Sequence, residues 1–372
     1  MGYSRTMFTR RKKPSLLRRR ALLLLALIFC LWLMGFLRMI LVPNYNIFLS
    51  SWWMWTLTSW KQGSCTPIRR FRYEPSVSKY DPFVAVSVIS GSETRHRQGY
   101  QRATWADPEG GFFSFHNVSF FDENDVVKMP MGMSCQEAAL KCDRKHPPRK
   151  DELWHHAAVF TGSSPGWWCF QSRGLIVLDH QLRKYPHAAW YFLVNDDTYV
   201  NVPALRKKAQ SYSATSSACA LGRVGHLQLP YYGDAFWTPI IWDGAGILIN
   251  RKAADQLLYK GRKPHSLSVI EQCIDNTRKL EKWCWWHSDW VLSGCLQSAK
   301  IGVTEDKSFI QFPAEKLGKA GFYMGERDME NSTKEADWIA NYCTKQTTCH
   351  KRKTLQSMLN IHNALKKQHI IN

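Results

Sequence analysis

The amino-acid sequence predicts an α/β fold in which helices lie on both faces of a sheet. Apolar runs that are too short for helices alternate along the chain with longer stretches of helical periodicity. Polar and turn-forming residues bound these runs, as they do around residues 190–194 (WYFLV). The 372 residues are 45% hydrophobic, which is enough for one large domain or two ordinary ones. Strands that alternate with helices in this way favour a sheet covered on both faces.

The expected elements follow the chain in order. Strands are predicted at 83–91, within 112–121, and at 190–194, 246–250 and 300–303. Helices are predicted within 93–105 and at 174–184, 202–210, 289–299 and 354–368. The helical spacing of the 174–184 segment stops at Pro186, while Asn201 and Ser288 can cap the helices that follow them. Pro203 is tolerated because it falls in the first turn of its helix.

The N-terminal region predicts a membrane anchor. Residues 1–20 form a basic tail, and residues 21–42 are apolar over a length that can span a bilayer as a helix. The small-residue cleavage site of a secretory signal peptide is missing from the sequence there. The positive-inside rule places residues 1–20 in the cytosol and the rest of the chain in the lumen. The sequence therefore predicts a single-pass type II membrane protein.

The remainder of the chain divides into three parts. Residues 43–80 have no sustained helical or strand period and are interpreted as a stem. Four tryptophans in this stem either rest in the membrane interface or dock on the folded domain: Trp52, Trp53, Trp55 and Trp60. Residues 81–350 hold the folded domain, and residues 351–372 form a C-terminal helical tail.

The cysteines and two sequons agree with a lumenal domain. Of eleven cysteines, Cys30 lies in the apolar segment and ten follow it, an even number that suits disulfides in an oxidising compartment. Their pairing stays open, and zinc is disfavoured because no Cys-x-x-Cys pair is present. Asn117 and Asn331 begin N-glycosylation sequons.

The net charge of +20 does not predict a nucleic-acid partner. Much of the excess lies in residues 1–20, on the cytosolic side of the predicted anchor. The folded part has no basic stripe with interleaved aromatic residues, which nucleic-acid binding would favour. We therefore expect no nucleic-acid partner.

Two adjacent carboxylates, Asp196 and Asp197, end the predicted strand 190–194. In α/β sheets, ligands bind beyond the carboxyl ends of the strands. A hard divalent cation such as Mn²⁺ or Mg²⁺ would offset the repulsion between the two side chains and could hold a substrate diphosphate. The alternative is a solvated Asp-Asp turn that caps the next helix.

Four segments in consistent order resemble the fringe-like β1,3-glycosyltransferases, and within them the core 1 β1,3-galactosyltransferase branch. NDDTYV at 195–200 is similar to the Asp-Asp-Asp-Thr-Tyr-Val motif of that family, and 84–107 resembles its first strand and helix ending in Ala-Thr-Trp. WDGAGILINRKAADQL at 242–257 resembles its Gly-Gly-Ala-Gly segment, with Asp243 in place of the first glycine. The segment 287–303 resembles its Glu-Asp-Val, Cys-Leu and Gly-Val stretch. Together they span roughly residues 81–320.

The resemblance implies a lumenal GT-A domain, a Rossmann-like fold that transfers a sugar from a UDP-sugar to a glycan or glycoprotein hydroxyl with inversion. It implies Asp289 as catalytic base, whose alternative role is a carboxylate at a helix N-terminus. Asn195, Asp196 and Asp197 become metal-site residues, with Asp196 also near the ribose. Further donor-site residues would be Arg97, Arg102 and Trp105, whose alternative roles are a solvated helix face for the two arginines and a core position for Trp105. The acceptor-site candidates are Trp285, Trp286, Gly244 and Gly246.

Besides Asp243, three positions depart from the family pattern. Asn195 replaces the first Asp of the triplet, and Ser288 replaces the Glu that precedes Asp289. Ile310, in FIQF at 309–312, occupies the place of the histidine that the resemblance makes a metal ligand. An isoleucine cannot bind a metal. Either another group such as His287 or a water fills the position in the Mn²⁺ or Mg²⁺ site, or metal binding is weak, or the alignment with the family slips at this segment.

Two functions of different class follow. The first is an inverting Golgi β1,3-glycosyltransferase, with the ER as the alternative compartment, UDP-galactose as donor and UDP-N-acetylglucosamine next. The second is a non-catalytic relative that acts as a membrane-anchored chaperone or glycan-binding protein. Retention of Asp196, Asp197 and Asp289 favours the enzyme, whereas Asn195 and Ile310 favour the relative. A homodimer is left open.

Overall fold

The computed structural model describes residues 65–68, 81–91, 94–107, 116–132, 170–228, 237–260, 266–280, 288–310, 340–350 and 352–368, and near the N-terminus Phe29, Cys30 and Trp32. The chain divides into two compact units, Met1–Ser59 and Trp60–Asn372. In the first unit the rings of Phe29 and Trp32 stack with centroids 6.2 Å apart. Within the described ranges, no helix has the length and apolar character needed to cross a bilayer. Apart from these three residues, the predicted anchor 21–42 lies outside the described part of the chain.

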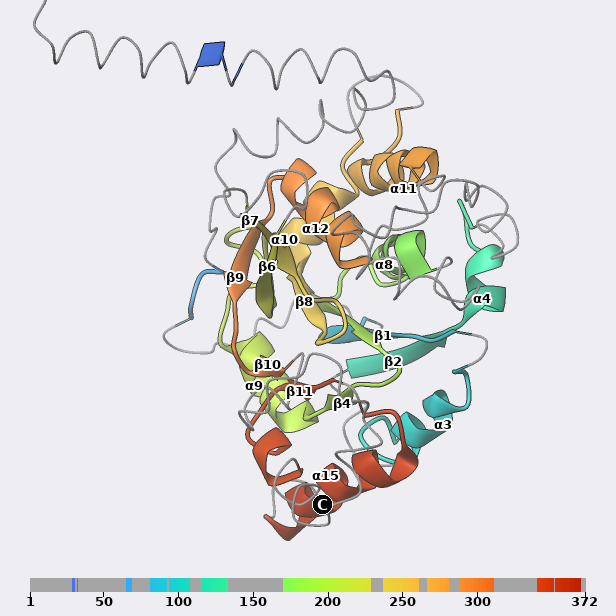
Figure 1. Ribbon diagram of the computed structural model, residues 1–372, viewed down its shortest axis with the longest axis vertical. Helices are drawn as coiled ribbons and strands as arrows, with labels where there is room; N and C mark the ends of the chain where they lie inside the picture. The colour runs from blue at the N-terminus through green and yellow to red at the C-terminus, as the bar shows by residue number, and fades with distance from the viewer. Residues whose placement is uncertain are drawn as a thin grey trace, which may run out of the picture. The chain divides into compact units, whose positions relative to one another are not determined.

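A six-stranded mixed sheet forms the centre of the second unit, in the order β2-β1-β3-β8-β5-β9 (Figure 1). Its strands are β1 (Val84–Ile89), β2 (His116–Phe121), β3 (Trp190–Asn195), β5 (Cys219–Gly222), β8 (Ile247–Asn250) and β9 (Gly302–Glu305). β1 pairs in parallel with β2 and β3, and β8 runs antiparallel to β3 and β5. The α/β class and the strands predicted from the apolar runs are confirmed.

Helices cover both faces of this sheet. They are α3 (Arg97–Arg102), α4 (Glu123–Val127), α8 (Phe170–Lys184), α9 (Val202–Gln210), α10 (Arg251–Leu257), α11 (Val269–Leu280), α12 (Ser288–Ser298) and α15 (Leu355–Lys367). Figure 1 shows α8, α11 and α12 on one side and α3, α9 and α15 on the other. The two-residue period of β3 divides its side chains between the two cores, since Phe192 joins the cluster with α9 and α15, and Leu193 joins the cluster with α8 and α12.

Helix ends follow local side-chain chemistry. The side chain of Asn201 accepts a hydrogen bond from the Ala204 N–H and caps α9, as predicted. Asn250 caps α10 in the same way. Ser288 is the first residue of α12. The predicted C-terminal helix is α15, which begins after the cap Thr354 and buries Met358, Ile361 and Leu365 in the core, so residues 355–367 are part of the folded unit.

Two small sheets complete the second unit. One has the order β10-β11-β4 and contains β10 (Phe309–Ile310), β11 (Thr348–Cys349) and β4 (Tyr199–Val200). The other pairs β6 (Val224–Gln228) with β7 (Trp237–Ile241). β4 begins two residues after Asp197, so the small three-stranded sheet adjoins the end of β3.

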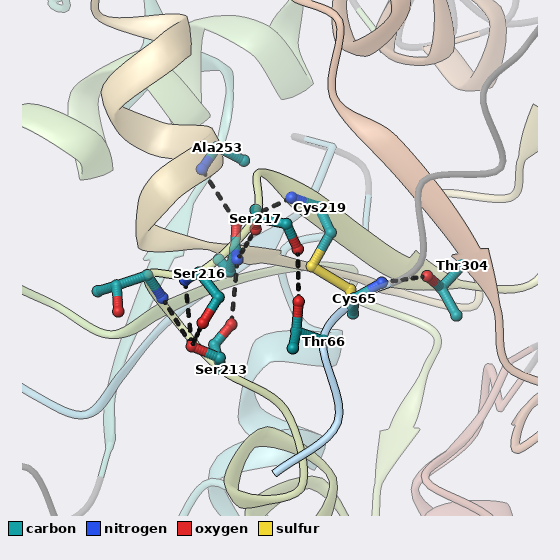
Figure 2. The surroundings of a disulfide bond; sticks show 10 residues. Cys65, Thr66, Ser213, Ser216, Ser217, Cys219, Ala253 and Thr304 are labelled. Atoms are coloured by element: carbon teal, nitrogen blue, oxygen red, sulfur yellow. Dashed lines mark hydrogen bonds between the residues drawn. A yellow bond between two sulfur atoms is a disulfide. The ribbon is translucent and has the colours of Figure 1, made fainter.

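Part of the predicted stem is bonded to the central sheet. Cys65 forms a disulfide with Cys219 of β5, and its N–H donates to the Thr304 hydroxyl of β9 at 2.9 Å. Figure 2 shows this disulfide beside the hydrogen bond of 3.0 Å between the Thr66 and Ser217 hydroxyls. Residues 65–68 therefore belong structurally with the folded domain.

The disulfide prediction is confirmed for three pairs: Cys65–Cys219, Cys273–Cys295 and Cys343–Cys349. The second joins α11 to α12, and the third joins residue 343 to β11. Cys30 is free and exposed. The remaining cysteines lie outside the described residues.

Candidate functional site

Residues 196–198, which we call the acidic turn, lie at the carboxyl ends of three parallel strands. β1, β2 and β3 run in parallel, and Asp196 and Asp197 follow β3 directly. The Asp196 N–H donates to the Ile89 carbonyl at 3.0 Å, which fixes the turn to the end of β1. Both carboxylates are buried, with 6% and 7% of the residue exposed. A fully solvated Asp-Asp turn is therefore excluded.

Asp196 is held by Thr94, which precedes α3, and by Arg97, the first residue of α3. Its Oδ2 accepts from the Thr94 hydroxyl at 2.5 Å, and its Oδ1 lies 3.4 Å from the Arg97 guanidinium. Burial, and then the neighbouring Asp197 carboxylate, raise the pKa of Asp196 to about 7, against the opposing effects of Thr94 and Arg97. The turn thus combines a carboxyl group of high pKa with a second buried carboxylate.

Asp197 pairs with a histidine that the sequence analysis did not identify. Nε2 of His350 lies 2.9 Å from Oδ1 of Asp197, and both side chains are buried. The antiparallel register of β11 with β4 pairs Cys349 with Tyr199, which brings the next residue, His350, to the acidic turn. The Arg352 N–H also donates to the Asp197 carbonyl at 2.6 Å. No local sequence pattern predicts this pairing, because β4 and β11 are each two residues long and lie far apart in the chain.

Ile310 contributes to the same region through its backbone. Its side chain is buried beside Phe309 in the core, and its carbonyl accepts the His350 N–H at 3.0 Å. The position that the resemblance assigns to a histidine is therefore a packing position, and a histidine from the next strand, β11, reaches the acidic turn.

The turn after β7 contacts both carboxylate regions. The Gly244 carbonyl accepts from the Thr198 hydroxyl at 2.7 Å, which joins this turn to the acidic turn. The Asp243 N–H donates to Oδ1 of Asp289 at 2.6 Å, which joins it to α12. Residues 243–244 therefore connect the Asp197–His350 pair to the candidate base.

Both glycines of this turn have steric roles. A Cβ at Gly244 would lie 2.4 Å from Cε1 of His350, so the imidazole fills the space that a side chain would need. Gly246 has φ +92, a conformation that favours glycine, and a Cβ there would lie 2.6 Å from the Phe192 ring. These contacts explain why glycine stands at positions 244 and 246, the two glycines proposed above for the acceptor site.

Asp289 lies in the first turn of α12 and is buried, with 6% of the residue exposed. Its backbone carbonyl accepts from the Ser293 hydroxyl at 2.5 Å, and the same hydroxyl accepts the Ile241 N–H of β7 at 2.9 Å. The helix therefore holds Asp289 rigidly against the end of β7. A carboxylate in the first turn also interacts favourably with the helix dipole.

The predicted donor-site residues separate in the structure. Arg97 contacts Asp196, but the Arg102 guanidinium lies over the Phe120 ring, 3.8 Å from its centroid. Trp105 is buried in the core. The structure adds Gln101, which is fully buried and donates from Nε2 to the carbonyls of Asn195 at 3.3 Å and Asp196 at 3.0 Å.

Several predicted residues contribute no described side-chain contact to the site. Asn195 is the last residue of β3 and pairs with Ile89 of β1; its backbone carbonyl accepts from Gln101 and from the Thr198 N–H at 3.2 Å, but no contact of its side chain is described. Asn117 lies within β2 and pairs with Ala85. Trp285, Trp286, His287 and Asn331 lie outside the described residues.

Comparison of the sequence with models of protein families gives no match, and comparison with curated proteins gives none either. Among the described residues no group of three or more His, Cys, Asp or Glu side chains is arranged as a metal site. Asp197 and His350 alone offer a carboxylate oxygen and an imidazole nitrogen at one point. Their chemistry fits a cation that takes further ligands from a bound substrate.

Proposed function

We propose that this chain is an inverting β1,3-glycosyltransferase with a GT-A fold that uses a UDP-sugar donor. UDP-galactose is the first donor to consider and UDP-N-acetylglucosamine the second, as the four-segment resemblance implies. The acceptor is a hydroxyl of a glycan or glycoprotein in the Golgi or ER lumen, and residues 21–42 anchor the chain as a type II protein. A homodimer is compatible with this proposal.

The observation that carries the proposal is the link through residues 243–244. The Gly244 carbonyl accepts a hydrogen bond from Thr198, next to Asp197, and the Asp243 N–H donates one to Asp289. Displacement at a sugar carbon needs a group that accommodates the leaving diphosphate and a base that serves the incoming hydroxyl. The link holds candidates for both groups in one rigid frame.

In the proposed reaction, Asp289 accepts the proton of the attacking acceptor hydroxyl. The hydroxyl oxygen forms the new bond to the anomeric carbon while the bond to UDP breaks on the opposite face, which inverts the configuration. Asp197 and His350 would hold Mn²⁺ or Mg²⁺, which when bound supplies positive charge that offsets charge on the diphosphate. Arg97 carries a further positive charge beside the acidic turn.

A non-catalytic chaperone or glycan-binding protein is the second candidate. This candidate is favoured because the carboxylates already have hydrogen-bond partners within the protein. Thr94 and Arg97 bind Asp196, and the Asp243 N–H binds Asp289. Such a protein would keep the fold and bind a glycoprotein without turning over a donor.

The test is release of UDP by the full-length protein in detergent, with a panel of UDP-sugars and with Mn²⁺ or a chelator. We expect acceptor-dependent release from one donor that is lost in Asp289→Asn and in Asp197→Ala. Asp255→Asn, which removes an exposed carboxylate on α10, is the matched control and should retain activity. Binding of a glycoprotein without turnover of any donor would instead favour the second candidate.

A further inference from the structure

We propose that the Cys343–Cys349 disulfide positions His350 for cation binding with Asp197. This inference rests on the cation site of the proposed function and adds a covalent element to it. The disulfide is contiguous with the site, because Cys349 directly precedes His350 in the chain.

The first part of the argument is the short strand that carries the histidine. β11 consists of Thr348 and Cys349 alone, with two paired residues on β10 and two on β4. A ladder this short supplies few backbone hydrogen bonds to hold a side chain that must meet a metal at a defined distance. A second constraint on β11 is therefore needed.

The disulfide supplies that constraint from the core. Cys343 and Cys349 are both buried and belong to the same core cluster as Ala340. The disulfide closes a loop between residues only six apart in sequence. The position of Cys349 is thus fixed to the helical segment 340–343 as well as to the neighbouring strands.

The histidine itself then has little freedom. Its N–H is bonded to the Ile310 carbonyl at 3.0 Å, and its ring occupies the space beside Gly244. With the preceding Cys349 fixed by the disulfide, Nε2 is directed to Asp197 at 2.9 Å. Removal of a group that orients a metal ligand typically lowers metal affinity by about 10–100-fold.

Another described disulfide provides the matched control. Cys273–Cys295 joins α11 to α12 and contains no residue adjacent in sequence to Asp197 or His350. Removal of either disulfide takes away one buried covalent link, but only removal of Cys343–Cys349 releases the residue next to the proposed ligand.

The experiment titrates the full-length protein with Mn²⁺ alone and measures free Mn²⁺ by electron paramagnetic resonance. We expect Cys343→Ala/Cys349→Val to weaken Mn²⁺ binding at least about tenfold, toward the value of His350→Ala, with an unchanged circular dichroism spectrum. Cys273→Ala/Cys295→Val should bind Mn²⁺ within about twofold of wild type. Substitution by Co²⁺ adds a ligand-field spectrum that reports loss of the imidazole nitrogen.

The outcomes separate the two proposals. Equal Mn²⁺ affinity in the wild type and the Cys343/Cys349 variant, with His350→Ala weakened, overturns the positioning role and leaves the cation site standing. A wild type that binds no Mn²⁺, either alone or in a second titration with UDP present, overturns both the positioning role and the cation site. If the double variant fails to fold, a glycine inserted after Cys349 keeps the disulfide and lengthens its connection to His350. Wild-type Mn²⁺ affinity in that insertion variant would equally overturn the inference.

Discussion

The imidazole of His350 occupies the space in which Gly244 would carry a side chain. A Cβ at residue 244 would lie 2.4, 2.8 and 2.9 Å from Cε1, Nε2 and Nδ1 of the ring, distances that side-chain carbons do not adopt. The glycine and the histidine come from the turn after β7 and the end of β11. Their contact ties the Asp289 side of the site to the Asp197 side.

Gly244→Ala should therefore displace the His350 ring. We expect a loss of stability of about 1–3 kcal/mol, the usual cost of overpacking, and a Mn²⁺ affinity that falls about tenfold or more. Thermal unfolding and the Mn²⁺ titration measure the two effects. Gly99→Ala is the control, because a Cβ at this α3 position meets nothing within 4 Å and alanine in a helix is about 0.5–1 kcal/mol more stable than glycine. Unchanged Mn²⁺ binding in Gly244→Ala would show that the ring can move without cost to the site.

Gln101→Met should loosen the acidic turn. Gln101 is fully buried, and its loss removes this donor from the buried hydrogen bond to the Asp196 carbonyl and from the part-buried one to the Asn195 carbonyl, at a cost of about 1–3 kcal/mol. We expect weaker UDP binding by calorimetry together with the loss of stability. Gln98→Met removes a buried glutamine that donates to the Ser90 hydroxyl at 2.9 Å, so it should lower stability and leave UDP affinity closer to wild type. Equal UDP affinities in the two variants would exclude a specific role for Gln101.

Asp306 should make the free energy of unfolding depend on pH in the acid range. Burial alone would raise its pKa, but hydrogen bonds from Lys208 and Ser308 outweigh burial, and the pKa of Asp306 lies below its ordinary value. A depressed folded-state pKa stabilises the protein above the unfolded pKa, near 4, and this contribution is lost as the pH falls through the folded value. The difference in Tm between wild type and Asp306→Asn should thus shrink from pH 6 to pH 3. A Tm difference between wild type and Asp306→Asn that stays constant over this pH range would contradict the argument.

The three disulfides should differ in their effect on stability. Their sequence separations are 154, 22 and 6 residues for Cys65–Cys219, Cys273–Cys295 and Cys343–Cys349. On a chain-entropy model these loops correspond to about 5, about 3 and about 2 kcal/mol. Denaturant unfolding of the three double variants should follow that order. A largest loss at Cys343–Cys349 would mean that the native-state role of this disulfide outweighs loop entropy.

The sheet could be predicted because each of its strands is an apolar run bounded by polar residues. WYFLV at 190–194 is β3 almost residue for residue, and the cap at Asn201 was evident from local chemistry alone. The carboxylates at the end of β3 could be placed at a sheet edge for the same reason. Local patterns thus account for the elements and for the placement of Asp196 and Asp197, whereas Asp289 was predicted from the four-segment resemblance.

The rest of the site depends on contacts between distant segments. His350 reaches Asp197 through strands of two residues, which leave no periodicity to detect. Arg102 lies on the same short helix as Arg97, yet Arg102 turns to Phe120 while Arg97 meets Asp196. Ile310 looked like a lost metal ligand because its core environment could not be seen from the sequence.

The Cys65–Cys219 disulfide decides which proteolytic cuts can free the folded domain. A cut anywhere from residue 66 to residue 218 leaves both pieces joined through that bond, so the protein would keep its full mass on a non-reducing gel. A single cut before Cys65 separates the domain from residues 1–64 without any reduction. A form of the domain that is freed by a single cut should therefore begin at or before Cys65, because a cut between Cys65 and Cys219 leaves the domain joined to the N-terminal segment.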